Sequence, residues 1–282
     1  MKMKELDHAS VLAKLPDRDS RGHKGDYGKL LLLCGSRGYT GAAALASMGA
    51  LRCGAGLVFL GVPESIYAIE AVKLTEPVVF PLPDLDGMFA PEAVEQIVHR
   101  LDRVDAVLIG PGLGQSDGTL AVLRCVLENF SGPVIVDADG INLLAQHKDL
   151  LRGRTGITIL TPHEGEAARL LGRPVTDRLW DAVTLARELG AIVVLKGHET
   201  LITDGEQIFP NPTGNPGMAV GGSGDVLAGM IAGLLGQKLS AIDAAACGVW
   251  LHGAAGDLCA REMGQYAMLP TDLLGVLPRL LK

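Results

Sequence analysis

The stretch GNPGMAVGGSGDVLAGMIAGLLG, residues 214–236, joins a glycine-rich half to an apolar half. The apolar half has large residues at helical spacing: Val226, Leu227, Met230, Ile231, Leu234 and Leu235. Small residues form a second face of the same helix: Ala228, Gly229, Ala232 and Gly233. An apolar face together with a small-residue face predicts a buried helix that packs closely against a neighbour.

The glycine-rich half precedes this helix and ends at one acid, Asp225. The small residues Gly222, Ser223 and Gly224 leave backbone N–H groups uncovered at the positive end of the helix dipole, which predicts an anion hole. The same dipole is expected to favour the ionised form of Asp225. A carboxylate beside an anion hole can take a proton from a hydroxyl that attacks a phosphate. The alternative is that Asp225 only stabilises the helix start.

Short apolar runs alternate with longer segments of helical period along the rest of the chain. The runs are KLLLLC (29–34), GLVFLG (56–61), DAVLIG (105–110), PVIVDAD (133–139), ITILTP (157–162) and AIVVLKG (191–197). This alternation predicts an α/β fold, a three-layer α/β/α arrangement with a mostly parallel central sheet and no separate lid domain. TLITDGEQIFP (200–210) differs, because Asp204-Gly205 between two alternating stretches predicts a hairpin at a sheet edge.

Polar or glycine-rich segments follow five of these runs. They are CGSRGYTGAAALAS (34–47), GPGLGQSDG (110–118), DADGIN (137–142), TPHEGE (161–166) and KGHET (196–200). One glycine-rich turn is ordinary in a tight connection. Five from one edge of a parallel sheet predict a ligand site there, because open α/β sheets bind ligands at the carboxyl ends of their strands.

The composition limits the classes of molecule that this protein could bind. The 282 residues are 48% hydrophobic and 20% charged, which fits one globular domain over 1–282 with residues 1–24 as a lead-in segment. A net charge of −7 and 4% aromatic residues argue against nucleic-acid binding. No apolar segment is long enough to predict a membrane span or a signal peptide, so a cytoplasmic location is expected. Five scattered cysteines predict neither a disulfide framework nor a zinc site.

The motifs together resemble one family. GDYGKLLLLCGSRGYTGAAALA (25–46), GPGLG (110–114), VDADGIN (136–142), TPHEGE (161–166), KGHET (196–200), GGSGDVLAGMIAG (221–233) and HGAAGD (252–257) occur in the order found in the ADP-dependent NAD(P)H-hydrate dehydratases of the ribokinase-like superfamily. GGSGD alone would fit any small-molecule kinase of that superfamily. The resemblance therefore depends on the whole set.

The resemblance implies a hydro-lyase that repairs nicotinamide nucleotides. The expected reaction converts (6S)-NADHX and (6S)-NADPHX into NADH and NADPH and releases AMP and phosphate from ADP. Asp225 would be the base that activates the C6 hydroxyl, and the N–H groups of Gly222, Ser223 and Gly224 would stabilise the transferred phosphoryl group. ADP or ATP is the implied co-substrate, with Mg²⁺.

The resemblance also implies ligand-binding roles for further residues, because of their positions in the motifs. The implied ADP/AMP-binding residues are Lys196, Gly197, His198, Glu199, Thr200 and Gly224. The implied NAD(P)HX-binding residues are Ala42, Gly112, Gly114, His163 and Asp225. His163 stands where many kinases of the superfamily have Asn, which disfavours an ordinary kinase, although a lone His is often only a structural hydrogen-bonding group.

Other acids and histidines have less defined roles. Glu166 falls on the position that organises magnesium through water. Asp137 and Asp139 could help with magnesium or substrate, and Asp139 could instead cap the helix that starts near residue 140. His252 and Asp257 are interpreted as packing or supporting groups.

Two alternatives stay open from the sequence: an ATP-dependent kinase of a vitamin precursor alcohol, of the hydroxymethylpyrimidine or thiazole type, or a non-catalytic nucleotide-binding regulator. The resemblance implies a homo-oligomer, with a tetramer expected. No epimerase domain is expected within these residues, so cooperation with a separate NAD(P)HX epimerase is expected as well. No nucleic-acid or membrane partner is expected.

Overall fold

The structure is a computed structural model, and it describes residues 2–282. A ten-stranded sheet runs through the molecule in the order β1-β12-β11-β10-β9-β8-β7-β2-β3-β4. Its strands are β1 (Lys2–Met3), β2 (Lys29–Leu33), β3 (Leu57–Pro63), β4 (Val78–Leu82), β7 (Ala106–Ile109), β8 (Val134–Val136), β9 (Thr158–Leu160), β10 (Ile192–Leu195), β11 (Leu201–Thr203) and β12 (Gln207–Pro210). All neighbouring strands pair in parallel except β10 with β11 and β11 with β12.

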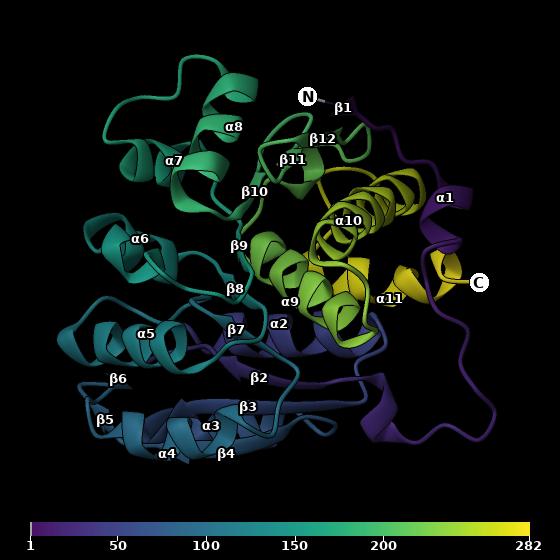
Figure 1. Cartoon of the computed structure of the whole chain (residues 1–282). Helices are drawn as coiled ribbons and strands as arrows, with labels where there is room; N and C mark the ends of the chain where they lie inside the picture. Colours follow the sequence, from purple (N-terminus) through teal and green to yellow (C-terminus); the bar gives the residue numbers. More distant parts are fainter. Residues whose placement is uncertain (1) are drawn as a thin grey trace.

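Helices cover both faces of this sheet (Figure 1). One layer holds α2 (Thr40–Arg52), α9 (Ser223–Gly236), α10 (Ala241–Met263) and α11 (Pro270–Leu280), with α1 (His8–Leu12) and α3 (Glu64–Lys73) at its margins. The other layer holds α4 (Ala93–Leu101), α5 (Asp117–Asn129), α6 (Asp139–Gln146), α7 (Glu164–Leu171) and α8 (Arg178–Leu189). The predicted three-layer arrangement is therefore confirmed.

The strand sequences explain why both faces must be covered. Successive residues of a strand point to opposite faces. In β2, Leu30 and Leu32 enter the core on the α9 side, whereas Leu31 and Leu33 enter the core on the α5 side. All four are fully buried. A continuous apolar run, rather than an alternating one, is what a parallel strand with helices on both faces requires.

The small-residue face of α9 packs against α2, as its sequence predicts. A Cβ on Gly229 would collide with the carbonyl oxygen of Ala46, and a Cβ on Gly233 with that of Ala50. In the opposite direction, a Cβ on Gly49 of α2 would lie 2.6 Å from the carbonyl oxygen of Val226. The two helices therefore touch through their backbones, which fixes the N-terminus of α9 relative to the sheet.

The edges of the sheet differ from the prediction. The hairpin of β11 and β12 forms as expected, but β1 pairs with β12 and takes the outer position. The lead-in segment is thus part of the fold, and Val11 of α1 is fully buried. At the other edge, β4 was not predicted because Pro81 interrupts it, and an edge strand tolerates proline.

A second small sheet lies beside the main one: the hairpin of β5 (Asp84–Leu85) and β6 (Met88–Phe89). Asp86 and Gly87 both have positive φ at its turn, as a two-residue hairpin loop requires. Three short 3-10 helices complete the described chain, at Lys24–Tyr27, Lys148–Leu151 and Pro216–Met218. Within residues 2–282, no helix is long and apolar enough to span a membrane.

Candidate functional site

The segments that follow the parallel strands meet at one edge of the sheet. The Gly35 N–H donates to the Pro111 carbonyl at 2.8 Å, which joins the segments after β2 and β7. Gly110 lies so close to the Asp137 carbonyl that a Cβ would collide with it, which joins the segments after β7 and β8. His163 and Lys196 form an isolated parallel bridge between the segments after β9 and β10. The predicted motifs are therefore neighbours.

Lys196 lies at the centre of this edge. Its Nζ is 2.8 Å from Asp137 Oδ1 and 3.8 Å from Glu166 Oε2. The Thr161 hydroxyl donates to the same Asp137 oxygen at 2.7 Å. Burial alone would lower the pKa of Lys196, but the carboxylates of Asp137 and Glu166 outweigh it and hold that pKa above its ordinary value. Lys196 is therefore a fixed cation.

Asp225 lies in the first turn of α9, near this cation. Burial is the largest influence on its pKa, followed by the charge of Asp137, and both raise it; Lys196 opposes them, and the pKa is raised to about 6. The sequence predicts a helix dipole that favours the ionised carboxylate, and burial and the like charge of Asp137 act against ionisation. A carboxylate with a pKa near 6 is ionised at neutral pH and is a stronger base than an ordinary aspartate.

The backbone at the start of α9 forms the predicted amide cluster. Gly222 is the N-cap residue with φ of 97°, a conformation that favours glycine. The Ser223 N–H donates to the Val220 carbonyl at 3.3 Å. Among residues 2–282, no acceptor bonds the N–H of Gly222, Gly224 or Asp225. These three amides are therefore available to an anion, and two of them belong to the predicted set.

Gly224 also keeps space open beside the cation. A Cβ at this position would lie 3.5 Å from Lys196 Nζ. The start of α9 and the end of β10 therefore face each other across a short gap. An anion in that gap would meet both the lysine charge and the helix amides, which is a favourable environment for a phosphate.

His252 of α10 supports the start of α9. Its Nε2 lies 3.4 Å from Ser223 Oγ. Burial lowers the pKa of His252 to about 4, so its ring is neutral at neutral pH. Asp257, one turn further along, accepts hydrogen bonds from Gly214 N–H and Asn215 Nδ2, each at 2.9 Å. Both positions agree with the supporting roles inferred from the sequence.

His163 and Glu166 cap α7 reciprocally. The ring Nδ1 of His163 accepts from the N–H groups of Gly165 at 3.0 Å and Glu166 at 3.2 Å, while Glu166 Oε2 accepts from the His163 N–H at 2.8 Å. Burial, aided by Lys196, lowers the pKa of His163, and burial raises the pKa of Glu166. With Nδ1 accepting, a neutral His163 carries its proton on Nε2, which lies 3.5 Å from Glu166 Oε1, and the ring edge is left for a ligand.

Few side chains near Lys196 could bind a metal ion directly. Within residues 2–282, no three His, Cys, Asp or Glu side chains gather closely enough to hold a metal ion together. Glu166 and Asp137 nevertheless place carboxylate oxygens next to Lys196. This arrangement fits Mg²⁺ that is held mainly by nucleotide phosphates and water, which is how proteins commonly bind it.

Two glycines of GPGLG pack closely against neighbouring elements, Gly112 against the start of α2 and Gly114 against β6. A Cβ on Gly112 would lie 2.8 Å from the Cβ of Ala42, and a Cβ on Gly114 would lie 2.5 Å from Met88 Sδ. The structure thus brings Ala42 and Gly112 together, as the sequence implies. Asp139 does not cap α6, whose N-cap residue is Ala138 without a side-chain cap; instead Asp139 Oδ2 accepts from the Gly114 N–H at 2.9 Å.

A cavity of about 940 Å³ lies beside the β10–β11 connection. Its walls come from the starts of α7 and α8, this connection, and the outer strands, and include Lys196, Gly197, His198, Glu199, Arg178 and Met3. Thr200 closes the connection, because its Oγ1 donates to the Gly197 carbonyl at 3.0 Å. Four of the five predicted KGHET residues therefore line one cavity.

Sequence reasoning missed Arg178 and its partner Glu164. The Arg178 guanidinium pairs with the Glu164 carboxylate and donates to the Leu195 carbonyl at 3.3 Å. Gly197 makes room for it, since a Cβ there would lie 2.6 Å from Arg178 Nη1. Arg178 and Gly197 are close only in the folded chain. The sequence signal was limited to a helix start at Asp177-Arg178.

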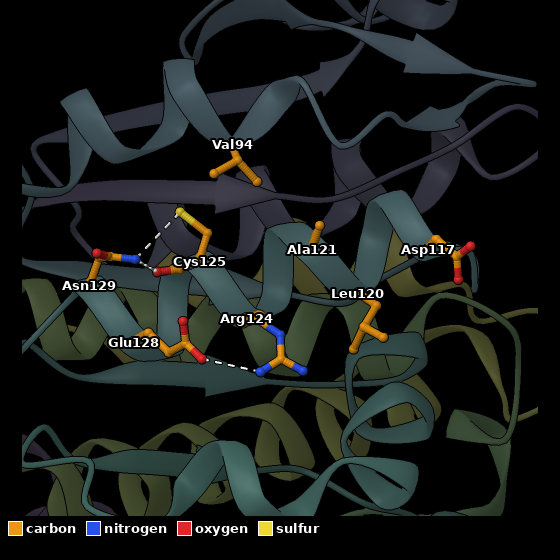
Figure 2. Close-up of a pocket in the computed structure, with 8 residues that line it drawn as sticks. All are labelled: Val94, Asp117, Leu120, Ala121, Arg124, Cys125, Glu128 and Asn129. Atoms are coloured by element: carbon orange, nitrogen blue, oxygen red, sulfur yellow. Dashed lines mark hydrogen bonds and ion pairs between the residues drawn. The ribbon is translucent and has the colours of Figure 1, made fainter.

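A smaller groove of about 380 Å³ lies between α4 and α5 (Figure 2). Figure 2 shows Arg124 and Glu128 paired along α5, and the Asn129 amide directed at the Cys125 carbonyl. These polar groups satisfy one another on the helix surface. The groove contains none of the predicted site residues and is not part of the candidate site.

Comparisons with known proteins agree with this arrangement. The NAD(P)H-hydrate dehydratase family, also called Carb_kinase, matches residues 30–279. The bifunctional NAD(P)H-hydrate repair enzyme Nnr of Moorella thermoacetica is 47% identical over an alignment of 284 residues, gaps included. The alignment covers 98% of this chain and 53% of that enzyme. The chain thus spans about half the length of the curated relatives it matches.

Two solved structures are similar over nearly their whole length. A ribokinase-like superfamily protein of Enterococcus faecalis has a TM-score of 0.86 and 30% identity, covering 99% of this chain and 95% of its own. The ADP/ATP-dependent NAD(P)H-hydrate dehydratase of Bacillus subtilis, co-crystallised with ATP and Mg²⁺, has a TM-score of 0.84 and 35% identity, covering 97% and 96%. The chain therefore belongs to the NAD(P)H-hydrate dehydratase family and has its ribokinase-like fold.

Proposed function

We propose that this chain catalyses the ADP-dependent dehydration of (6S)-NADHX and (6S)-NADPHX to NADH and NADPH, with release of AMP and phosphate. The observation that carries the proposal is Asp225, a carboxylate with its pKa raised to about 6, in the same helix turn as three amides without acceptors and across from the cation Lys196. A base, an anion hole and a fixed cation together form a phosphoryl-transfer site.

Phosphoryl transfer comes first in the proposed sequence. Asp225 accepts the proton of the C6 hydroxyl, and the hydroxyl oxygen bonds to the β-phosphorus of ADP. The bond from that phosphorus to the bridging oxygen breaks, and AMP leaves with the electron pair. Lys196 and the amides of Gly222, Ser223 and Gly224 stabilise the charge on the phosphoryl oxygens. Mg²⁺, with Glu166 acting through water, would supply further neutralisation of phosphate charge.

Elimination then completes the dehydration. The lone pair of the ring nitrogen expels phosphate, which leaves with the electrons of its bond to C6. Loss of a proton from C5 restores the ring double bond. Phosphorylation converts hydroxide, a poor leaving group, into phosphate, so kinase-like machinery performs a net loss of water.

The ligand positions follow from the two sides of the site. ADP or ATP is proposed to lie along Lys196, Gly197, His198, Glu199 and Thr200, with its phosphates at Gly224; the cavity beside the β10–β11 connection supports this placement. NAD(P)HX is proposed to lie against Ala42, Gly112, Gly114 and His163, with its C6 hydroxyl at Asp225. Crystals soaked with AMP should show adenosine beside residues 196–200.

One assay tests the proposal. The purified protein is incubated with NADHX, Mg²⁺ and either ADP or ATP, and the absorbance of the restored dihydronicotinamide ring is followed. Restored absorbance with stoichiometric AMP or ADP supports the dehydratase. A phosphorylated product without restored absorbance would identify a kinase of an alcohol substrate, and nucleotide binding without turnover would identify a regulator.

Assembly and partners are further proposals. We expect a homo-oligomer, specifically a tetramer. Light scattering coupled to size-exclusion chromatography measures the molar mass that decides this. We also expect one hydrate epimer to be consumed faster than the other, with an epimerase activity needed for full conversion. Adding an epimerase to the mixed epimers should then turn a two-phase progress curve into one phase. The cytoplasmic location stays a prediction.

A further inference from the structure

The turn after β8 directs two acids to opposite sides. Ala138 has φ of 48° and ψ of −117°, a conformation that residues with a Cβ rarely adopt. On one side, Asp137 bonds to Lys196 and Thr161 in the centre of the site. On the other side, Asp139 bonds to the GPGLG segment.

The GPGLG segment needs external support because of its composition. Gly112 and Gly114 have φ of 61° and 75°, and glycine gains more freedom than any other residue when such a segment loosens. The segment after β2 holds its first part, through the Ser36 hydroxyl to the Gly112 carbonyl at 2.8 Å. Asp139 holds its last part, through Gly114 N–H at 2.9 Å and the Gln115 amide at 3.2 Å.

The contacts of Asp139 separate it from the chemistry. Its remaining side-chain partner is Asn142 Nδ2 at 3.5 Å on its own helix. Among residues 2–282 no hydrogen bond joins Asp139 to Lys196 or to Asp225. Its effect on the site therefore passes through the backbone of Gly114.

We propose that Asp139 is a positioning residue that holds the Gly112–Gly114 part of the GPGLG segment in the conformation that binds the nicotinamide nucleotide. This inference rests on the proposed dehydratase function, because that function places NAD(P)HX against this segment. Loss of the Asp139 hydrogen bonds makes the Gly112–Gly114 segment more mobile and leaves the nucleotide-binding residues unchanged. It raises KM for NADHX, leaves nucleotide affinity intact, and changes kcat little, because Asp225 and the anion hole are unaffected.

The test compares Asp139→Ala with Asp139→Asn and a matched control. Asn keeps an oxygen that can accept from the Gly114 N–H, whereas Ala removes it. Asp117→Asn is the control, since Asp117 is an exposed acid just beyond the same segment without a bond to it. The measurements are kcat and KM for NADHX, AMP affinity by calorimetry, and hydrogen exchange of the amides in residues 110–116.

The expected result is a KM about tenfold or more higher for Asp139→Ala, which loses the hydrogen bonds from the Gly114 N–H and the Gln115 amide to a charged group. Faster exchange should be confined to residues 110–116, and Asp139→Asn should recover most of the loss. Equal KM increases in both variants, exchange that is unchanged in Asp139→Ala, or a parallel loss of AMP affinity would overturn the proposal. If the wild-type protein does not convert NADHX, the dehydratase function fails, while the exchange measurement still decides whether Asp139 holds the segment.

Discussion

Lys196 Nζ lies 2.8 Å from Asp137 Oδ1, where β8 and β10 end on either side of β9. The lysine side chain is 19% exposed and the Asp137 side chain 2%. This pair sets the electrostatics of the site, because Asp137 raises the pKa of Asp225 and Lys196 lowers it. Each partner thus acts on the proposed base in the opposite direction.

The first prediction concerns Lys196→Met, a substitution that removes the positive charge beside Asp225. Because Lys196 stabilises the ionised form of Asp225, its loss should raise the pKa of Asp225 above about 6. The acid limb of the pH profile of kcat/KM should then move to higher pH, and residual activity at pH 7 should fall further than at pH 9. Nucleotide affinity should fall as well. An acid limb at the wild-type position would show that Asp225 is not the titrating base.

The second prediction concerns Gly224→Ala, which adds a methyl group to the gap beside the proposed anion hole. The new Cβ would be in ordinary contact with Lys196 Nζ, at 3.5 Å, so the fold should tolerate it. It would also occupy space next to the amides proposed to bind phosphate. AMP affinity should fall by about tenfold or more, as expected for a group displaced from charge-assisted hydrogen bonds.

Gly221→Ala is the matched control for this change. A Cβ at Gly221 would have no atom of residues 2–282 within 4 Å, so the substitution adds the same methyl group to open space. Its AMP affinity should equal that of the wild type, measured by calorimetry at the same salt concentration. If both alanine variants bind AMP as well as the wild type does, the phosphate does not lie at the start of α9.

Much of the fold could be predicted because the apolar runs are long and unbroken. Leu30 to Leu33 are all buried, so their pattern could only fit a strand covered on both faces. β4 and β1 could not be predicted, since Pro81 interrupts the first and the second has only two residues. Edge strands are short and irregular, so they leave a weaker pattern than central strands.

The candidate site could be predicted in part for a similar reason. Motifs that directly follow strands must meet at one edge, so Lys196 and Glu166 could be predicted from the sequence, and Asp225 could be predicted from the glycine-rich helix start that precedes it. Arg178 was missed because it begins a helix and reaches the site only through tertiary contact with Gly197. The raised pKa of Asp225 could not be predicted, because the sequence shows the helix start but not the burial or the nearby Asp137.

The third prediction concerns that missed arginine. Arg178 is proposed to form one wall of the nucleotide cavity, where its planar guanidinium, held by Glu164, can lie against a purine base. Arg178→Ala should weaken AMP binding by about fivefold to thirtyfold, the range of a cation–π contact in a partly desolvated site. Arg152→Ala, at an exposed arginine outside the cavity, should bind AMP normally. Equal affinities for the two variants would place the base elsewhere.

The last prediction separates catalysis from stability at Asp225. Its folded pKa of about 6 lies above the unfolded value of 3.8, so the folded state binds a proton more tightly than the unfolded state does. The ionised carboxylate therefore destabilises the fold at pH 7 and above, and this cost disappears as the pH falls below 3.8. Asp225→Asn removes the charge and should raise the free energy of unfolding at pH 7 by up to about 3 kcal/mol.

The same substitution should remove the base. Turnover of NADHX should fall by about 10² to 10⁴, mainly in kcat, while AMP still binds. A more stable protein with almost no turnover is the combined result that a buried general base predicts, because its charge is costly to the fold and necessary for the reaction. If Asp225 only stabilises the helix start, Asn would serve nearly as well there. Near-wild-type turnover in the Asn variant, measured with thermal unfolding on the same sample, would refute the catalytic role.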